Sequence, residues 1–133
     1  MTTDRKMQIG EVADRTGLSL RTIRHYEEVG LVVPSARSKG GFRLYTETDV
    51  DRLMVIRRMK PLDFSLDEMR DLLEITDRLG SPGEDEAARE GLRERLDAYR
   101  EVADARCEKL RSRLAAAEDF AATLRHHLTE ATG

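Results

Sequence analysis

The residues from Ile9 to Tyr45 constrain the fold more than any other part of this chain. Two short segments with apolar residues at helical spacing meet at Gly17, and a turn containing glycine between two helices is typical of a helix-turn-helix. Ser19 is expected to cap the second helix. That helix carries basic residues spaced to share one face, namely Arg21, Arg24 and His25. A basic stripe on a short exposed helix is what a reader of the DNA major groove needs.

A basic hairpin is predicted directly after these helices. Val32 and Val33 can start a strand that Pro34 cuts short, and a polar loop with Arg37 and Lys39 follows. The next four residues alternate, so that one pair faces the helices and the other faces outward: Phe42 with Leu44, and Arg43 with Tyr45. If the apolar pair faces the helices, the outer face of the hairpin is basic, and the hairpin is a wing beside the helix-turn-helix.

Helix-start signals recur further along the chain. Thr46 with Asp49, and Ser65 with Glu68, predict capping boxes for a third and a fourth helix. The segment from Ser81 to Glu84 predicts another for a fifth helix, with proline at its first position. The sequence therefore indicates a mainly α protein with a small wing, divided into residues 1–79 and residues 80–133.

The last third of the chain is predicted to be one long helix that runs from Glu84 to Leu128, about 67 Å at about 1.5 Å per residue. Its apolar residues recur every three or four positions, a heptad seam with one stutter. The seam residues are Leu92, Leu96, Tyr99, Ala103, Cys107, Leu110, Leu114, Ala117, Ala121, Leu124 and Leu128. A single helix with one narrow apolar stripe buries little by itself, so we expect it to pair with a second copy of the chain.

The charge is distributed unevenly between the two parts. Residues 1–61 hold 12 basic and 8 acidic side chains, whereas the remainder holds 11 and 18, which together give the overall charge of −3. The N-terminal part is therefore suited to a polyanion although the whole chain is acidic. The single cysteine, and the lack of an apolar run long enough for a signal peptide or a membrane span, favour a cytoplasmic protein.

At this point the motifs resemble a known family. The run from Met7 to about Ile75 is similar to the DNA-binding domain of MerR-type transcriptional regulators, on the motifs IGEVADRTGLSLRTIRHYEEVGL, GGFRLYTETDVDRL and RRMKPLDFSLDEMRDLL. The resemblance implies a winged helix-turn-helix, two further helices and a long helix that pairs as an antiparallel coiled coil in a homodimer. It also implies binding to an inverted-repeat operator in promoter DNA, distortion of that DNA, and RNA polymerase as a partner at the promoter.

The resemblance assigns roles to particular residues. Those implied in DNA binding are Ser19, Arg21, Thr22, Arg24, His25, Tyr26, Arg37, Lys39, Arg43 and Tyr45. Tyr26 would brace the second helix against the duplex or the core, and Arg43 and Tyr45 would clamp the DNA backbone from the wing. The chain departs from the common pattern at His25, where many members have Tyr, and at Asp63, where many have Gly.

Other candidate sites are weaker. Basic residues of the third helix suit phosphate contacts or simple solvation equally well: Arg52, Arg57, Arg58 and Lys60. Cys107 lies on the seam, where cysteine behaves as a small apolar residue, although a disulfide with its mate in a second copy is a further hypothesis. His126 and His127 are adjacent on a helix and are poor co-ligands for one metal. We find no catalytic constellation, and we expect no enzyme activity, no metal and no cofactor.

Two other functions remain open at the level of sequence. One is an architectural, excisionase-like protein that bends DNA, and the other is a coiled-coil adaptor that binds proteins. The long helix disfavours the first, and a gel shift against promoter DNA would distinguish the second. Only Thr129 to Gly133 follow the seam, so we expect a minimal C-terminal tail, and the residues name no effector.

Overall fold

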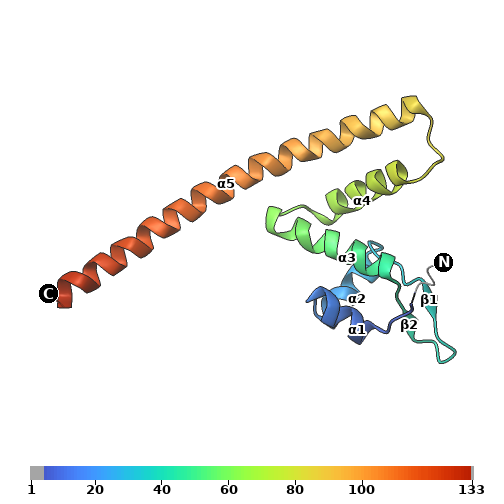
Figure 1. The fold of residues 1–133 in the computed structure, drawn as a ribbon, viewed down its shortest axis with the longest axis horizontal. Helices are drawn as coiled ribbons and strands as arrows, with labels where there is room; N and C mark the ends of the chain where they lie inside the picture. The colour runs from blue at the N-terminus through green and yellow to red at the C-terminus, as the bar shows by residue number, and fades with distance from the viewer. Residues whose placement is uncertain (1–4, 133) are drawn as a thin grey trace. The chain divides into compact units, whose positions relative to one another are not determined.

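A computed structural model describes residues 5–132 and confirms the mainly α fold, with a helix-turn-helix, a two-stranded wing and a long C-terminal helix (Figure 1). The chain divides into two compact units, one up to Asp77 and one from Arg78 onward. The predicted division at residue 79 is close to this boundary and remains a prediction about independent domains.

The helix-turn-helix consists of α1 (Ile9–Thr16) and α2 (Leu20–Glu28). Gly17 ends α1 in the left-handed region at φ 73°, where its N–H donates to the Ala13 carbonyl at 2.9 Å. Ser19 caps α2 as predicted, because its hydroxyl accepts from the Thr22 N–H at 3.0 Å. Val12 and Ile23 are fully buried, so the two helices share one core.

The wing is an antiparallel pair of β1 (Ala36–Arg37) and β2 (Arg43–Leu44). Its tip is a turn closed by the Gly41 N–H on the Ser38 carbonyl at 2.9 Å, and Gly41 adopts φ 82°. This arrangement is a three-residue hairpin loop with glycine at its left-handed position. On the other edge, Met7 and Tyr45 exchange backbone hydrogen bonds of 2.7 and 2.8 Å, which ties the wing to the segment before α1.

The predicted strand at Val32 and Val33 is wrong. The Leu31 and Val32 amides donate to the Tyr26 carbonyl at 2.9 and 3.4 Å, so they help to end α2 and are not available to a sheet. Val32 is buried against the core, whereas Val33 is exposed.

Two further helices complete the N-terminal unit. The capping boxes predicted at Thr46 and Ser65 are both present, at the starts of α3 (Glu47–Met59) and α4 (Leu66–Gly80). A short 3-10 turn, η1 (Lys60–Leu62), joins them, and Asp63 follows it at φ 57°. Asp63 therefore takes a left-handed conformation, which glycine favours and aspartate tolerates. Fully buried side chains from every part of this unit form the core, including Tyr26, Leu31, Tyr45, Leu53, Ile56 and Ile75.

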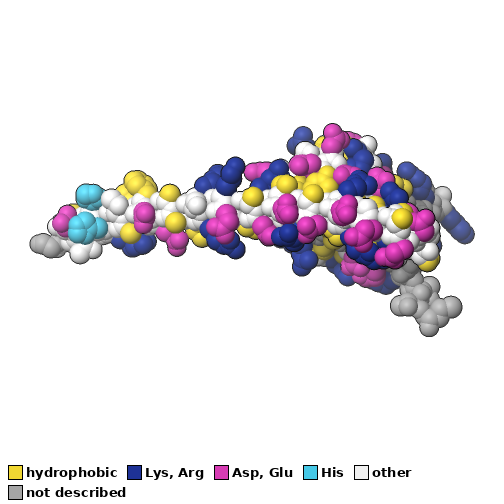
Figure 2. All heavy atoms as spheres, turned by 90° about the horizontal axis from the view of Figure 1, so that it is seen from above, with side chains coloured by type: hydrophobic (Ala, Val, Ile, Leu, Met, Phe, Trp, Pro, Cys, Tyr) yellow, Lys and Arg dark blue, Asp and Glu magenta, His cyan; other side chains and the backbone are white. Residues whose placement is uncertain are grey.

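The last helix, α5, runs from Glu86 to Thr132 without a break over 47 residues. The capping box predicted at Ser81 is wrong: Asp85 caps the helix by accepting from the Ala88 N–H at 2.8 Å, and Glu84 pairs with Arg78. Leu92 is buried, but Leu114, Leu124 and Leu128 are between 51% and 67% exposed. Figure 2 shows hydrophobic side chains spaced along this helix between acidic and basic ones. None of the helices in the described residues is both long and apolar enough to cross a bilayer.

Candidate nucleic-acid interface

The outward face of α2 is basic, as the spacing predicted. Arg21, Arg24 and His25 are all exposed, and with Glu28 they line a shallow hollow in the surface. Ile23 and Tyr26 lie on the opposite side in the core. Burying this apolar side fixes which way the three basic side chains point. The N-terminal end of the face is polar: the exposed Ser19 hydroxyl donates to the hydroxyl of the half-buried Thr22 at 2.8 Å.

Two tyrosines that the family resemblance places in the DNA-binding set lie in the core: Tyr26 and Tyr45. Tyr45 is fully buried, so the expectation that it faces outward is wrong. Its hydroxyl donates to the Glu27 Oε2 atom at 2.8 Å, and burial together with this acidic partner raises the pKa of Tyr45. Tyr26 is only 2% exposed, so it braces α2 against the core and not against a duplex. Both rings can position the interface, but neither can reach a phosphate.

Glu27 is the residue that sequence reasoning missed. Its carboxylate accepts from the Tyr45 hydroxyl and also pairs with the Arg43 guanidinium, and its side chain is only 12% exposed. One acidic side chain of α2 therefore holds both Arg43 of β2 and Tyr45, which directly follows that strand. The available signal was an acid three residues after Arg24, beside an otherwise basic stripe.

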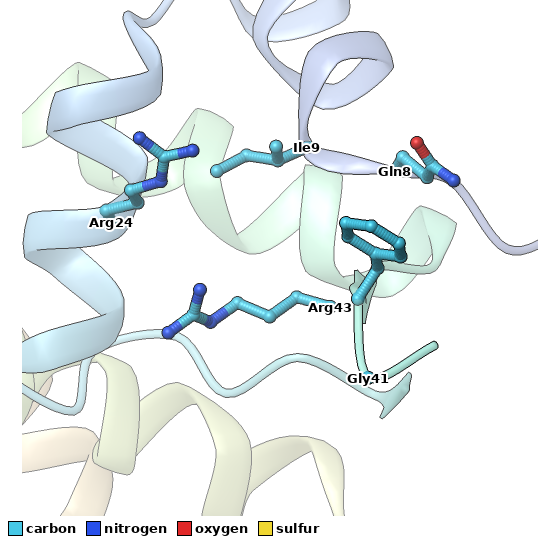
Figure 3. A pocket seen from close by; sticks show the side chains of 6 residues that line it. Gln8, Ile9, Arg24, Gly41 and Arg43 are labelled. Carbon is cyan, nitrogen blue, oxygen red and sulfur yellow. The ribbon is translucent and has the colours of Figure 1, made fainter. Parts of the chain in front are cut away.

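A small pocket lies where α1, α2 and the wing meet. It has a volume of about 150 Å³, and its lining residues are Gln8, Ile9, Arg24, Gly41, Phe42 and Arg43. Figure 3 shows the side chains of Arg24 and Arg43 extending from different elements toward the same space. Both arginines line this pocket, and guanidinium groups suit an anionic oxygen such as that of a phosphate.

The wing adds further positive charge. Arg37 lies directly opposite Arg43 in the strand pairing, and like charges in that position cost stability. The Arg37 guanidinium donates to the Gly41 carbonyl at 3.2 Å, while Lys39 is exposed at the tip. A local arrangement that opposes stability is expected where a site serves binding.

The basic residues of α3 separate into two groups. Arg52 donates to the Leu31 carbonyl at 2.7 Å and pairs with Asp77 at 2.9 Å, so its role is structural. Arg57, Arg58 and Lys60 are exposed. The Arg57 guanidinium lies next to the helix-turn-helix turn, 3.7 Å from where a Cβ atom on Gly17 would stand. Arg57 is thus the α3 residue that lies beside the α1–α2 turn.

Comparison with known proteins identifies the family. Residues 7–75 match the model of the MerR HTH family regulatory proteins, and residues 50–127 match the model described as MerR, DNA binding. Each match covers more than half of the chain. The chain belongs to the MerR family.

Curated members of the MerR family agree with this assignment. The mercuric resistance operon regulatory protein of Bacillus cereus is 45% identical over 73 residues, which are 55% of this chain and 55% of that protein. The transcriptional regulator CueR of Vibrio cholerae is 44% identical over 69 residues, 52% of this chain and 50% of that protein. The chain thus spans about half the length of these relatives. MerR-family proteins are DNA-binding transcriptional regulators and not enzymes.

Solved MerR-family structures share the fold. The lead(II) complex of the regulator PbrR691 from Ralstonia metallidurans is 35% identical with a TM-score of 0.55, and the match covers 85% of this chain and 84% of that one. A MerR-family regulator lacking the sensor domain, HiNmlR, was solved on promoter DNA. It matches with a TM-score of 0.68 over 86% of this chain and 80% of that chain; at 23% identity it supports the fold alone.

Some MerR relatives carry metals in their names, so the metal-binding side chains of this chain matter. Within residues 5–132, the structure has no group of three or more His, Cys, Asp or Glu side chains that could hold a metal ion. Cys107 is half-buried on α5. His126 lies near Glu130 at 3.3 Å, and its ring centroid is 6.2 Å from that of His127.

Proposed function

We propose that this MerR-family chain is a homodimeric transcriptional regulator that binds an inverted repeat in promoter DNA. Each copy places α2 in a major groove and lays its wing over the neighbouring sugar–phosphate backbone. The observation that carries the proposal is the set of exposed arginines on α2 and the wing, Arg21, Arg24, Arg37 and Arg43, of which Arg24 and Arg43 line one pocket. Phosphate contacts set the register of a protein on DNA, whereas base contacts set its sequence preference.

The N-terminal half of α2 supplies the reading residues. In helix-turn-helix proteins the first residues of the second helix contact base edges, which here are Arg21 and Thr22. Arginine reads guanine through two hydrogen bonds. Arg24 lies one turn further along and lines the pocket that it shares with Arg43. It therefore stands between the base-reading end of α2 and the phosphate-binding wing, and its substitution tests which of the two it serves.

The wing contributes phosphate contacts that do not depend on sequence. Arg43 is pre-positioned by Glu27, so little side-chain entropy is lost when it meets a phosphate. Lys39 and Arg37 extend the positive surface to the tip. We assign Tyr26 and Tyr45 to the support of this surface, because both are buried.

We propose the dimer because the apolar stripe of α5 is exposed in a single chain. Two copies paired through this helix hold two α2 helices at a fixed separation, and that separation sets the spacing of the operator half-sites. Fixed half-sites allow the protein to bend or twist the DNA between them, and RNA polymerase is the partner that reads the altered promoter.

A binding experiment on the full chain tests the proposal. Fluorescence anisotropy with duplexes from the region upstream of its own gene should give saturable binding by a dimer, and footprinting should protect an inverted repeat. The variant Arg21→Ala/Arg24→Ala should lose this binding, whereas Lys109→Ala/Arg111→Ala on α5 removes the same charge at exposed positions and should retain it. Binding without protection of a repeat, together with bending of all duplexes, would point to an architectural protein. A dimer that ignores every duplex would point to an adaptor.

A further inference from the structure

The apolar stripe of α5 has a mirror symmetry that fixes how two copies meet. Four pairs of seam residues lie at equal distances on either side of Leu110: Leu92 and Leu128 at 18 positions, Leu96 and Leu124 at 14, Tyr99 and Ala121 at 11, and Ala103 and Ala117 at 7. Eighteen residues are about five turns of helix, so Leu92, Leu110 and Leu128 lie in line on one face. We propose that two copies pair antiparallel with Leu110 on the two-fold axis; this inference rests on the proposed homodimer and adds its register.

The exposure of the seam in one chain agrees with this register. Leu92 is buried and Leu96, Tyr99 and Ala103 are half-buried, whereas Leu124 and Leu128 are 51% and 67% exposed. Antiparallel pairing about Leu110 places the exposed seam residues after Leu110 in one helix along the partly buried seam residues before Leu110 in the other. The exposed Leu124 of one copy then meets the half-buried Leu96 of the other.

The register also provides a partner for Phe120, which is 65% exposed and lies off the seam. At about 100° per residue, Phe120 and the half-buried Val102 both lie about 80° to the same side of Leu110. A two-fold axis perpendicular to the helices brings the same side of both copies together. Phe120 is ten positions after the centre and Val102 eight before it, so the phenylalanine ring of one copy falls beside the valine and Tyr99 of the other.

Charge on the opposite side fits the same arrangement. Arg100 lies ten positions before Leu110 and Glu118 eight positions after it, and both point about 80° to the other side of the seam. The guanidinium of one copy therefore meets a carboxylate of the other. Only Cys107 and Leu114 lack an apolar mate, and they face Arg113 and Arg106, whose aliphatic stems can cover them while the charged ends stay in water.

The register makes a specific geometric statement. When two helix axes are about 8–10 Å apart, two equivalent residues that face each other across the two-fold axis have their Cα atoms about 3.5–5.5 Å apart. This distance overlaps the range of Cα–Cα distances that a disulfide spans. The two Leu110 residues are such a pair. Cys107 of one copy and Cys107 of the other are offset by six positions, which is about 9 Å along the helix axis. This distance is too long for a disulfide. This register therefore argues against the disulfide between Cys107 residues considered above.

Cysteine cross-linking of the full-length protein tests the register. In a Cys107→Ser background, Leu110→Cys treated with diamide, which takes up the two electrons and two protons of the thiols, should convert most of the chain to a linked dimer on non-reducing electrophoresis. The matched control is Leu114→Cys in the same Cys107→Ser background. The two introduced cysteines of this variant would lie about 12 Å apart along the helix axis, so the fraction of linked dimer should be at least about ten-fold lower.

Sedimentation equilibrium of the reduced proteins separates the two levels of the proposal. If the protein is dimeric but Leu114→Cys or the native Cys107 links as well as Leu110→Cys, the register is wrong and the homodimer stands. If Leu110→Cys fails to link in a protein that remains dimeric, the register is also wrong. If the reduced wild-type chain is monomeric at concentrations well above those used for DNA binding, the homodimer itself fails.

Discussion

Several ion pairs of the N-terminal unit join residues from different elements far apart in the sequence, whereas the ion pairs along α5 join residues of the same helix. Arg15 pairs with Glu47, Arg43 with Glu27 and Arg52 with Asp77, at separations of 16 to 32 residues. On α5, Arg100 pairs with Asp97 and Asp104, and Arg111 with Glu108, at separations of three or four. The first set fixes a tertiary arrangement, but the second supports only a helix that would need such support in isolation.

The apolar side chains show the same difference. The N-terminal unit buries Leu53, Ile56 and Ile75 completely, while α5 leaves four of its leucines at least 39% exposed. The N-terminal unit therefore has a buried apolar core of its own, whereas much of the apolar stripe of α5 is exposed. In the homodimer that we propose, the N-terminal unit would hold the binding residues on α2, and pairing of α5 would set the separation between the two α2 helices.

The largest expected effect lies in the core of the N-terminal unit. Leu53→Ala, at a fully buried position of α3, should lower the free energy of unfolding by about 2–5 kcal/mol, because it leaves a cavity. Urea unfolding followed by tyrosine fluorescence in a Tyr99→Phe background reports this unit through Tyr26 and Tyr45. Val33→Ala, at a position 72% exposed, is the control and should change stability by less than about 0.5 kcal/mol. Equal effects of the two changes would mean that this core is not the stabilising element.

A charge on the seam of α5 should act on assembly. Leu124→Asp should raise the dimer dissociation constant about 100-fold or more, equivalent to about 2.7 kcal/mol, because each dimer would bury two carboxylates without partners. Sedimentation equilibrium measures the change. Ala122→Asp adds the same charge on the far side of the helix and should leave the dimer nearly intact. A dimer indifferent to Leu124→Asp would remove α5 as the interface.

Substitution of Arg24 tests whether this residue of α2 contacts a base or a phosphate. Arg24→Ala should cost about 1–3 kcal/mol in operator binding, and if the side chain reads a base it should also relax sequence preference at one position. Lys39→Ala, at the wing tip, should weaken binding to all duplexes about equally and reduce the salt dependence. Anisotropy titrations on the operator and on single-base variants at several salt concentrations distinguish these outcomes. A uniform loss for Arg24→Ala would assign it to a phosphate.

The smallest effect concerns an exposed, long-range ion pair. Arg15 lowers the pKa of Glu47, so the pair stabilises the fold above the carboxyl group's unfolded pKa, and that contribution is lost as the pH falls through the lower folded pKa. Glu47→Gln should therefore melt at a lower temperature than wild type at pH 7, and the difference should vanish in acid. Calorimetry across this pH range measures it, with Asp14→Asn as the control. A difference that persists at the acid end would contradict the ion-pair explanation.

The sequence predicted the helix starts well where the capping residue and its hydrogen-bond partner lie within one helical turn of each other. The caps at Ser19, Thr46 and Ser65 each need only a residue three positions away, and all three are present as predicted. The predicted box at Ser81 failed: Asp85 caps α5 four residues later, and the Glu84 side chain pairs with Arg78.

The sequence by itself determined the helices, the basic face of α2 and the apolar seam of α5, because periodicity and capping act between near neighbours. Only the tertiary structure decided that Tyr45 turns inward, that Val32 serves the end of α2, and that Glu27 holds the wing. Alternation along a strand gives two faces without saying which is buried. That choice depends on which side chains from distant segments fill the core, and it sets the direction in which Arg43 points.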